Sequence, residues 1–305
     1  MKIAISGLGR MGMQIVRKLA EGGHEVIAHN RSREPVDEAV TFGAKPAYGK
    51  MDIASSLAGA QAILWIMIPS DAVDAELEEW LGVLPQGSII IDGGNSDFRL
   101  TQKRAKKVAD RGSILLDSGT SGGVWGYVNG FSMMLGGDVS AFRTIEPALK
   151  TLALPSGGYQ HFSDSGSGHY VKMVHNAIEY GMMESLAEGY RMLKEGPYSG
   201  LDLGAAGTVW QKRSVVTSWL NELTRDALLE NPTLEGIDGF VAENGETRWT
   251  LEVAKEKSIP LPAIQAAMDV RIASQKGEVN FATKLLSAMR NKFGGHKINK
   301  EVNKK

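Results

Sequence analysis

The chain has 305 residues, enough for two domains or one large one. Hydrophobic residues make up 43% and charged residues 23%, and 34 Lys+Arg against 35 Asp+Glu leave a formal net charge of -1. This composition is typical of a globular protein and excludes an overall basic field that would attract nucleic acid or an anionic membrane. The absence of cysteine excludes disulfides, thiolate metal sites and a cysteine nucleophile.

Targeting and metal-binding signals are also missing from the sequence. The longest apolar run, Ala62–Ile68, is far shorter than the roughly 20 residues that a membrane span needs. The N-terminus begins with an apolar strand rather than a signal peptide, and the six histidines show no two-His helical spacing. We therefore expect a cytoplasmic protein with no metal, no membrane partner and no nucleic-acid partner.

Apolar strands alternate with amphipathic helices in the first half of the chain. The predicted strands are Lys2–Ser6, Glu25–His29, Ala62–Ile68, Ser88–Asp92 and Ile114–Asp117, and the helices between them are Met11–Glu21, Val73–Leu84 and Leu100–Asp110. Strand and helix signals continue through Phe131–Leu135, Ser140–Leu152 and Tyr159–Phe162. This alternation predicts a mostly parallel sheet with right-handed crossovers.

The pattern changes to helices alone after the Ser/Gly-rich segment Ser163–Gly168. The predicted helices are His169–Lys194, Leu203–Gln211, Val215–Leu229, Thr247–Lys257, Leu261–Ser274 and Ala282–Arg290, and the polar, basic Lys297–Lys305 is expected to be a solvated tail. The predicted fold class is thus an α/β Rossmann-type dinucleotide-binding domain, residues 1–165, followed by an all-α domain, residues 166–305, with a C-terminal tail.

A glycine-rich turn follows the first predicted strand. Its sequence is Gly7-Leu8-Gly9-Arg10-Met11-Gly12, and it opens a helix. The first glycine makes the turn, the second lets the backbone approach a pyrophosphate, and the third allows close packing of helix and strand. This context favours dinucleotide binding over a merely tight turn.

The end of the second predicted strand bears on the choice of cofactor. An NAD-binding domain usually carries Asp or Glu there, to bind the ribose 2′-hydroxyl. Here the residues are Asn30-Arg31-Ser32-Arg33, and two guanidinium groups fit a 2′-phosphate better. We therefore favour NADP over NAD; the alternative is that both arginines belong to a solvated loop.

Two further glycine-containing segments follow strands at the same predicted sheet edge. They are Asp92-Gly93-Gly94-Asn95-Ser96 and Ser118-Gly119-Thr120-Ser121-Gly122-Gly123, and each alone would also fit a simple turn. Ligands gather at the carboxyl ends of parallel strands. The nucleotide contacts expected at these strand ends are Gly7, Leu8, Gly9, Arg10, Met11, Gly12, Asn30, Arg31, Ser32, Met67, Ile68 and Asn95.

Polar residues form a stripe on the long predicted helix. Lys172, Asn176 and Glu179 are spaced i, i+4, i+7, which places them on one face, and His175 and Tyr180 flank them. A lysine, an amide and a carboxylate together can donate protons, accept them and anchor a substrate. A solvent-exposed polar face with i, i+4 pairs is the alternative.

These motifs are recognisable together. Ile-Asp-Gly-Gly-Asn-Ser (91–96), Gly-Thr-Ser-Gly-Gly (119–123) and Gly-His-Tyr-Val-Lys-Met-Val-His-Asn-Ala-Ile-Glu-Tyr-Gly (168–181) resemble decarboxylating 6-phosphogluconate dehydrogenase over nearly the whole chain. The chain is similar to the short form of this family. The resemblance implies metal-free oxidative decarboxylation of 6-phosphogluconate to ribulose 5-phosphate and CO2 with reduction of NAD or NADP, as in the pentose phosphate pathway.

The resemblance also implies a role for each matched residue. Lys172 would be the general base and later acid at C3, and Glu179 would protonate the enediol at C1. The positions that match substrate-binding residues are Asn95, Ser121, Gly122, Gly123, His175, Asn176, Tyr180, Arg271, Arg290 and His296. Arg290 and His296 would lie past the last helix and reach into a neighbouring subunit, which implies a homodimer or a dimer of dimers with shared active sites.

One position departs from the pattern, and two other functions compete. The long form has a phosphate-binding lysine where this chain has Asn244, and Arg248 is a candidate to replace it. The sequence is also similar to 3-hydroxyisobutyrate-type dehydrogenases, which share the expected fold. That family carries Lys-x-x-Asn-Asn where this chain has Lys172-x-x-His175-Asn176, and its substrate has no phosphate. A non-catalytic homologue would have no need to keep Lys172 and Glu179.

Overall fold

The computed structural model describes residues 1–295. These divide into two compact units, one ending at Met173 and the other beginning at Val174. Across the described part of the chain, no helix combines the length and the apolar character that crossing a membrane requires.

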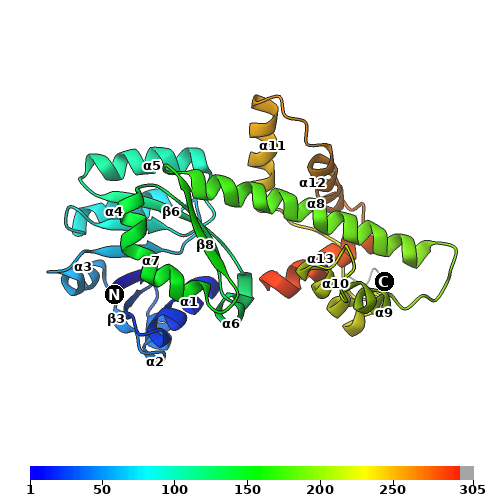
Figure 1. The fold of residues 1–305 in the computed structure, drawn as a ribbon, viewed down its shortest axis with the longest axis horizontal. Coiled ribbons are helices and arrows are strands. Elements are labelled where there is room, and N and C mark those ends of the chain that lie inside the picture. The colour runs from blue at the N-terminus through cyan, green and yellow to red at the C-terminus, as the bar shows by residue number, and fades with distance from the viewer. Residues whose placement is uncertain (296–305) are drawn as a thin grey trace. The chain divides into compact units, whose positions relative to one another are not determined.

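An eight-stranded sheet forms the centre of the first unit (Figure 1). Its strands are β1 Lys2–Ser6, β2 Glu25–His29, β3 Lys45–Ala47, β4 Ile63–Ile66, β5 Ile89–Asp92, β6 Ile114–Ser121, β7 Ser132–Gly136 and β8 Gly158–Ser163. Their spatial order is β3-β2-β1-β4-β5-β6-β7-β8, and every neighbouring pair is parallel except β6 and β7. The order reverses between β1 and β4, and an open parallel sheet binds its ligand at the carboxyl ends beside such a switch point.

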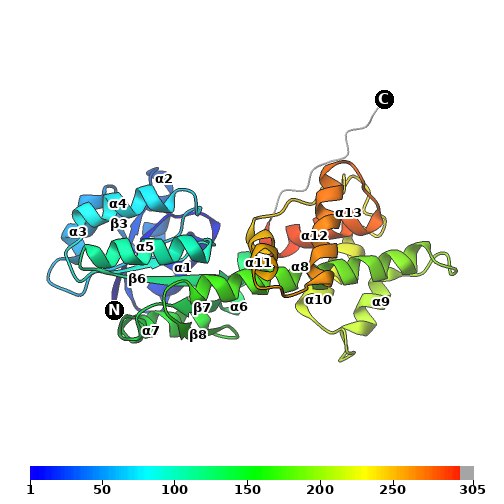
Figure 2. The same cartoon turned by 90° about the horizontal axis from the view of Figure 1, so that it is seen from above.

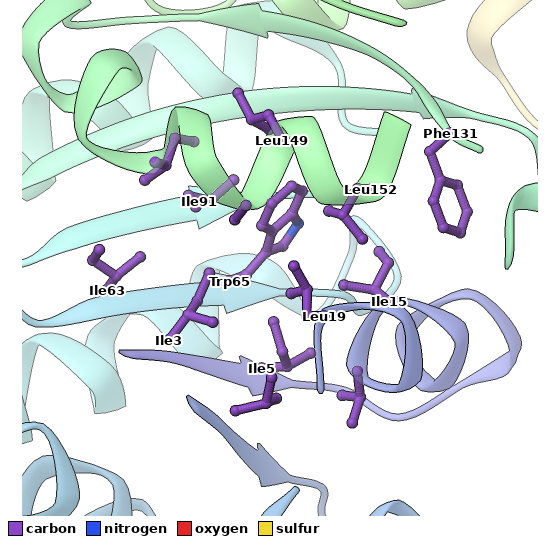
Figure 3. Packing of buried hydrophobic residues seen from close by; sticks show 14 of the residues in the cluster. Ile3, Ile5, Ile15, Leu19, Ile63, Trp65, Ile91, Phe131, Leu149 and Leu152 are labelled. Carbon is purple, nitrogen blue, oxygen red and sulfur yellow. The ribbon is translucent and has the colours of Figure 1, made fainter. Parts of the chain in front are cut away.

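Helices cover both faces of this sheet. They are α1 Arg10–Glu21, α2 Glu34–Thr41, α3 Lys50–Leu57, α4 Val73–Val83, α5 Phe98–Asp110, α6 Gly126–Asn129 and α7 Val139–Ala153. Successive strand residues point to opposite faces. Ile5 and Trp65 therefore pack with Leu19 of α1 and Leu149 of α7 (Figure 3), whereas the intervening Leu64 packs on the other face, in the core to which α3, α4 and α5 contribute.

Three elements between residues 30 and 61 were not predicted from the sequence. α2 and α3 have eight residues each and bury only two apolar side chains apiece, so neither shows a clear helical period. β3 has three residues and contains Pro46. Proline is tolerated there because β3 is an edge strand, where a missing N–H donor costs nothing.

The strand predicted as Ile114–Asp117 is longer than expected. β6 continues to Ser121, and residues 117–121 pair antiparallel with β7 in a register that runs from Asp117 opposite Gly136 to Ser121 opposite Ser132. The prediction that this strand ends at Asp117 is therefore wrong, and the first four residues of the segment Ser118–Gly123 belong to β6. A segment of small residues with glycine resembles a turn in the sequence. In the structure its backbone forms hydrogen bonds with the antiparallel strand β7.

The second unit is entirely helical in its described residues (Figure 2). It contains most of α8 (Ser167–Glu195), together with α9 Leu203–Trp210, α10 Trp219–Glu230, α11 Glu246–Glu256, α12 Pro262–Gln275 and α13 Phe281–Gly294. Met183 and Tyr190 of α8 pack with Leu228 of α10 and with Leu285 and Met289 of α13. These contacts give the unit a hydrophobic core of its own.

Two predicted helix ends in this unit are wrong. α10 begins at Trp219 rather than Val215, because the Ser218 side chain accepts a hydrogen bond from the Asn221 N–H and caps the helix there. α13 continues to Gly294 rather than ending at Arg290, and Gly295, with φ 59°, provides the left-handed residue that stops it.

The first turns of α8 belong to the first unit and lie close against β6 and β7. The fully buried Asp117 carboxylate accepts hydrogen bonds from the backbone N–H groups of Gly166 (2.7 Å) and His169 (2.9 Å) at the start of the helix. A Cβ atom on Gly119 would lie 2.3 Å from the Cβ of Lys172. Glycine at 119 is therefore what allows the backbone of β6 to approach the lysine.

We expect Gly119→Ala to destabilise the protein by about 1–3 kcal/mol, because the added methyl group overpacks the contact with Lys172. Gly82→Ala is the matched control, since a Cβ on this α4 glycine meets nothing within 4 Å. The control should gain about 0.5–1 kcal/mol from helix propensity. Urea unfolding of both variants measures the difference, and equal stabilities would contradict the packing explanation.

Candidate functional site

The glycine turn between β1 and α1 has the geometry of an anion cradle. Gly7 has φ 97°, and its N–H donates to the His29 carbonyl oxygen at 3.0 Å. A Cβ on Gly12 would lie 2.0 Å from the Gly7 carbonyl oxygen, so only glycine lets α1 begin this close to the turn. Gly9 is the N-cap residue, no side chain caps the helix, and a Cβ at Gly9 would meet nothing. The N-terminus of α1 therefore lacks a side-chain cap and has open space beside Gly9, which fits a pyrophosphate.

The residues that follow β2 include one that holds the glycine turn and two arginines that differ in their contacts. Asn30 accepts a hydrogen bond from the Leu8 N–H at 3.0 Å and donates to the Ser32 hydroxyl at 2.9 Å. Arg33 is paired with Asp37 and lies over the Tyr48 ring, 4.6 Å from its centroid. Arg31 is exposed beside them. Of the two arginines, Arg31 is therefore the better placed to receive a 2′-phosphate.

The ends of β1, β4 and β5 lie next to one another. The Met67 N–H donates to Ser6 at 2.7 Å, and the Gly93 N–H donates to Ile66 at 2.9 Å. A Cβ on Gly94 would lie 2.8 Å from the Ile68 carbonyl oxygen. The glycine turn, Met67, Ile68 and the loop that presents the exposed Asn95 therefore share one edge of the sheet, as expected for a nucleotide site.

The end of β6 adds the expected substrate loop to the same unit. Gly122 has φ 131° and Gly123 φ 51°, conformations that side chains other than glycine rarely adopt. The following short helix is tied to α1, because the Tyr127 N–H donates to Gln14 at 3.0 Å and Lys18 donates to the Tyr127 carbonyl at 2.7 Å. The position of the Ser121–Gly123 loop is thus linked to the helix that follows the glycine turn.

Lys172 lies in the second turn of α8, still within the first unit. Its side chain is only 5% exposed, and its Cβ packs on the backbone of Gly119. The alternative of a solvated polar face is therefore wrong for this residue.

The rest of the polar stripe lies in the second unit, where Asn176 is hydrogen-bonded and Glu179 lies at ion-pair distance from His175. Asn176 donates to Glu246 at 3.0 Å and its side-chain oxygen lies 3.0 Å from His175 Nδ1. His175 Nδ1 lies 4.0 Å from the Glu179 carboxylate. Asn176 and Glu246 are both buried. These contacts fix the orientation of the Asn176 amide and place an imidazole beside the Glu179 carboxylate.

Two buried arginines lie near Tyr180 in the same unit. Arg271 is fully buried, its guanidinium carbon lies 3.4 Å from the centroid of the Tyr180 ring, and burial lowers its pKa to about 10. Burial also lowers the pKa of Arg290, against the attraction of Tyr180, Glu179 and Glu246. Within residues 1–295 neither guanidinium has a carboxylate within ion-pair distance. Two buried cations without a paired anion predict an anionic ligand.

Several contributing residues were not found from the sequence. Glu246 holds Asn176, and Asn244 accepts the Tyr180 hydroxyl hydrogen bond at 2.7 Å. The buried Glu184 has its pKa raised to about 7 by burial and by Glu188, with Arg271 opposing. Only tertiary contacts bring Asn244 and Glu246, the first residue of α11, to α8, and nothing in the spacing of that segment indicates them. Glu184 lies on α8 itself, and its burial is what the sequence does not indicate.

The structure changes what was expected of the residues assigned to the phosphate site. Arg290 does not lie past the last helix; it is inside α13 and only 9% exposed. Its environment includes Glu179 and Tyr180 of its own chain. Arg248, the proposed replacement for the lysine absent at Asn244, is exposed and paired with Glu243. His296 lies outside the described residues.

Comparison with known families covers both units. The family description "NAD binding domain of 6-phosphogluconate dehydrogenase" matches residues 2–159, and "6-phosphogluconate dehydrogenase, C-terminal domain" matches residues 168–305. The NAD(+)-dependent, decarboxylating 6-phosphogluconate dehydrogenase of Haloferax volcanii is 38% identical over 300 residues, which cover 98% of each chain.

Solved structures share the fold. A Plasmodium falciparum 6-phosphogluconate dehydrogenase, solved in its apo form and with NADP+ and 6-phosphogluconate, aligns with a TM-score of 0.81 at 24% identity, over 95% of this chain and 70% of its own. A Salmonella typhimurium 3-hydroxyisobutyrate dehydrogenase aligns with a TM-score of 0.75 at 20% identity, over 93% of this chain and 98% of its own. At these identities the structural likeness concerns the fold alone.

Proposed function

Because the chain belongs to the 6-phosphogluconate dehydrogenase family, we propose that it oxidises and decarboxylates 6-phosphogluconate to ribulose 5-phosphate and CO2 while reducing NAD(P). The observation that carries this proposal is the pair of buried, unpaired guanidinium groups of Arg271 and Arg290 beside the Glu179–Tyr180 segment of α8. A 3-hydroxyisobutyrate-type substrate has no phosphate dianion to balance these two charges.

We assign residues 1–165 to nucleotide binding and residues 166–305 to substrate binding and dimerisation. α8 supports the combination of the two parts in one reaction, because it is a single helix of 29 residues that carries both Lys172 and Glu179. The two proposed proton-transfer residues are thus carried by one secondary-structure element.

The nucleotide would bind across the edge of the sheet. The first N–H groups of α1 would hold the pyrophosphate, and Arg31 would pair with a 2′-phosphate, so that NADP is favoured over NAD. When bound, the nicotinamide supplies the hydride acceptor. The residues of the chain provide the cradle, the orientation and the proton transfers.

Lys172 would act first, at C3 of the substrate. It accepts the proton of the C3 hydroxyl as the hydride leaves C3, which produces a 3-keto acid. The C1–C2 bond then breaks, CO2 departs, and the electron pair moves into the new C2=C3 double bond. Lys172 returns its proton to the oxygen at C3, which yields the enediol, so this step needs no other acid.

Glu179 would complete the reaction. It donates a proton to the former C2, which becomes C1 of ribulose 5-phosphate, while His175 lies beside its carboxylate. Ser121, Gly122, Gly123, Asn95 and Asn176 would hold the hydroxyl and carboxylate groups of the sugar acid. Tyr180, Arg271 and Arg290 would hold the phosphate end.

We expect wild-type protein to reduce NAD(P) with 6-phosphogluconate and not with 3-hydroxyisobutyrate. Lys172→Met should abolish hydride transfer and leave nucleotide affinity unchanged. Glu179→Gln should slow turnover by about 100-fold or more and still form reduced nucleotide in the first turnover, because it acts after the hydride leaves. Stopped-flow absorbance at the reduced-nicotinamide band distinguishes the two. A lysine variant with near-normal kcat would contradict this mechanism.

For the cofactor, we expect Arg31→Ala to raise the KM for NADP by about 10-fold or more and to change the KM for NAD little, since a charge-assisted hydrogen bond contributes about 1.5–3 kcal/mol. Arg33→Ala is the matched control, because Arg33 is already paired with Asp37. Parallel steady-state kinetics with both nucleotides measures the effect. Equal losses for NAD and NADP in the Arg31 variant would refute the NADP preference.

We also propose that the chain is a homodimer, or a dimer of dimers, in which His296 completes the partner's site and Arg290 serves its own chain. Mixing and refolding Lys172→Met with His296→Ala should then recover about a quarter of wild-type activity, because half of the dimers are mixed and each has one intact site. The mixture of Lys172→Met with Arg290→Ala should stay inactive. Recovery in the second mixture, or none in the first with mixed dimers verified, would contradict this arrangement.

A further inference from the structure

The guanidinium group of Arg104 is the most highly connected buried cation of the first unit that the proposed mechanism does not use. Arg104 lies on α5 and is only 2% exposed. Its Nε and Nη2 donate to the two carboxylate oxygens of Asp74, each at 2.9 Å, and Nη2 also donates to the Ser70 carbonyl oxygen at 2.9 Å. Its Nη1 donates to the Ser96 hydroxyl at 2.9 Å and to the Asp92 carboxylate at 3.3 Å.

These partners come from two segments at the binding edge of the sheet, the loop after β4 with the first turn of α4, and the end of β5 with the loop after it. Ser70 and Asp74 follow β4, after Met67 and Ile68. Asp92 ends β5, and Ser96 closes the loop that carries Asn95. One planar guanidinium therefore holds both loops at once, and its fork geometry restricts their separation.

The loop after β5 is also held from its own side. The Ser96 hydroxyl donates to Asp92 at 2.9 Å, and the Gly94 N–H donates to the other oxygen of that carboxylate at 3.2 Å. A Cβ on Gly93 would lie 2.0 Å from Trp65 Nε1, so this backbone rests directly on the end of β4. Asn95 is the exposed residue of an otherwise fixed segment.

Stability alone is a weak explanation for this arrangement. The Asp74 side chain is 59% exposed, so its pairing with Arg104 contributes little to folding. The Asp92 side chain is fully buried, and apolar residues of similar volume are often at least as stabilising as a buried ion pair. What a guanidinium provides and an apolar residue cannot is a fixed distance between two polar loops.

We infer that Arg104 is a positioning residue that holds Asn95 in the orientation the reaction requires. The inference rests on the proposed function, in which Asn95 contacts both the nucleotide and the sugar acid. Arg104 itself is only 2% exposed and has its guanidinium donors directed to Asp74, Ser70, Ser96 and Asp92, so we assign it no contact with either ligand. Its effect on catalysis should therefore pass through Asn95.

The test variant is Arg104→Lys, which keeps a positive charge beside Asp92 but cannot contact Asp74, Ser70, Ser96 and Asp92 together. We expect it to lower kcat/KM for 6-phosphogluconate by about 10- to 100-fold, as for other small displacements of a positioned group. A role limited to charge compensation would be rescued by lysine, and kcat/KM would stay at the wild-type value. Lys107→Gln is the control, since Lys107 lies on the same helix and forms an exposed pair with Glu78.

A double-mutant cycle with Asn95→Ala shows whether the loss of kcat/KM in Arg104→Lys depends on Asn95. If Arg104 acts through Asn95, Arg104→Lys should cause little further loss in the Asn95→Ala background. Losses that multiply, or a wild-type kcat/KM in Arg104→Lys, would overturn the inference. If Arg104→Lys fails to fold by circular dichroism, Ser96→Ala, which keeps Arg104 and removes one anchor, replaces it in the same cycle.

For the same four proteins of the cycle, the Kd for NADPH is also measured, by nicotinamide fluorescence. Wild-type protein with no activity on 6-phosphogluconate would refute the proposed function, and the cycle in Kd would still decide whether Arg104 acts through Asn95. Non-additive losses in Kd would support the inference, and additive losses or none would overturn it.

Discussion

The close approach of α8 to strands β6 and β7 is the constraint on which the candidate site depends. The Asp117 carboxylate binds two N–H groups at the start of the helix, and Gly119 removes the side chain that would separate strand and helix. Negative charge at a helix N-terminus is favourable, so a buried carboxylate there needs no cation. Lys172 is consequently held against the strand that ends in Ser121.

The polar groups of the site are fixed by other polar groups rather than by solvent. Glu246 orients Asn176, Asn244 orients Tyr180, and Asn30 orients the glycine turn through the Leu8 N–H. Of these hydrogen bonds, the one between Asn176 and Glu246 is fully buried, and such a bond makes a single arrangement much more favourable than its competitors. Arg271 and Arg290 are the exception, because two guanidiniums in one buried region repel each other until an anion arrives. The cost of holding them there is consistent with a ligand that carries a phosphate dianion.

Local sequence patterns predicted much of the fold and the family. Buried strands such as Ile89–Asp92 and the glycines of the first turn carry strong local signals, so the Rossmann-type fold, the helical second half and the stripe from Lys172 to Glu179 were all expected. The short elements α2, β3 and α3 were missed because their stability comes from packing on neighbours rather than from a long period. The strand at Ser118–Ser121 was missed because its partner, β7, lies more than ten residues away.

The sequence by itself determined the glycine positions, the spacing on α8 and the membership of the family, because each depends on residues close together in the chain. Tertiary structure alone decided that Arg290 lies within a helix beside Tyr180 of its own chain, that Glu246 binds Asn176, and that Arg104 joins two loops. Apart from the Arg104 contacts with Asp92 and Ser96, these contacts join residues about 30 to more than 100 positions apart, and the position of Arg290 depends on where its helix ends. Their physical cause is burial, which makes each polar group find a partner that no local pattern identifies.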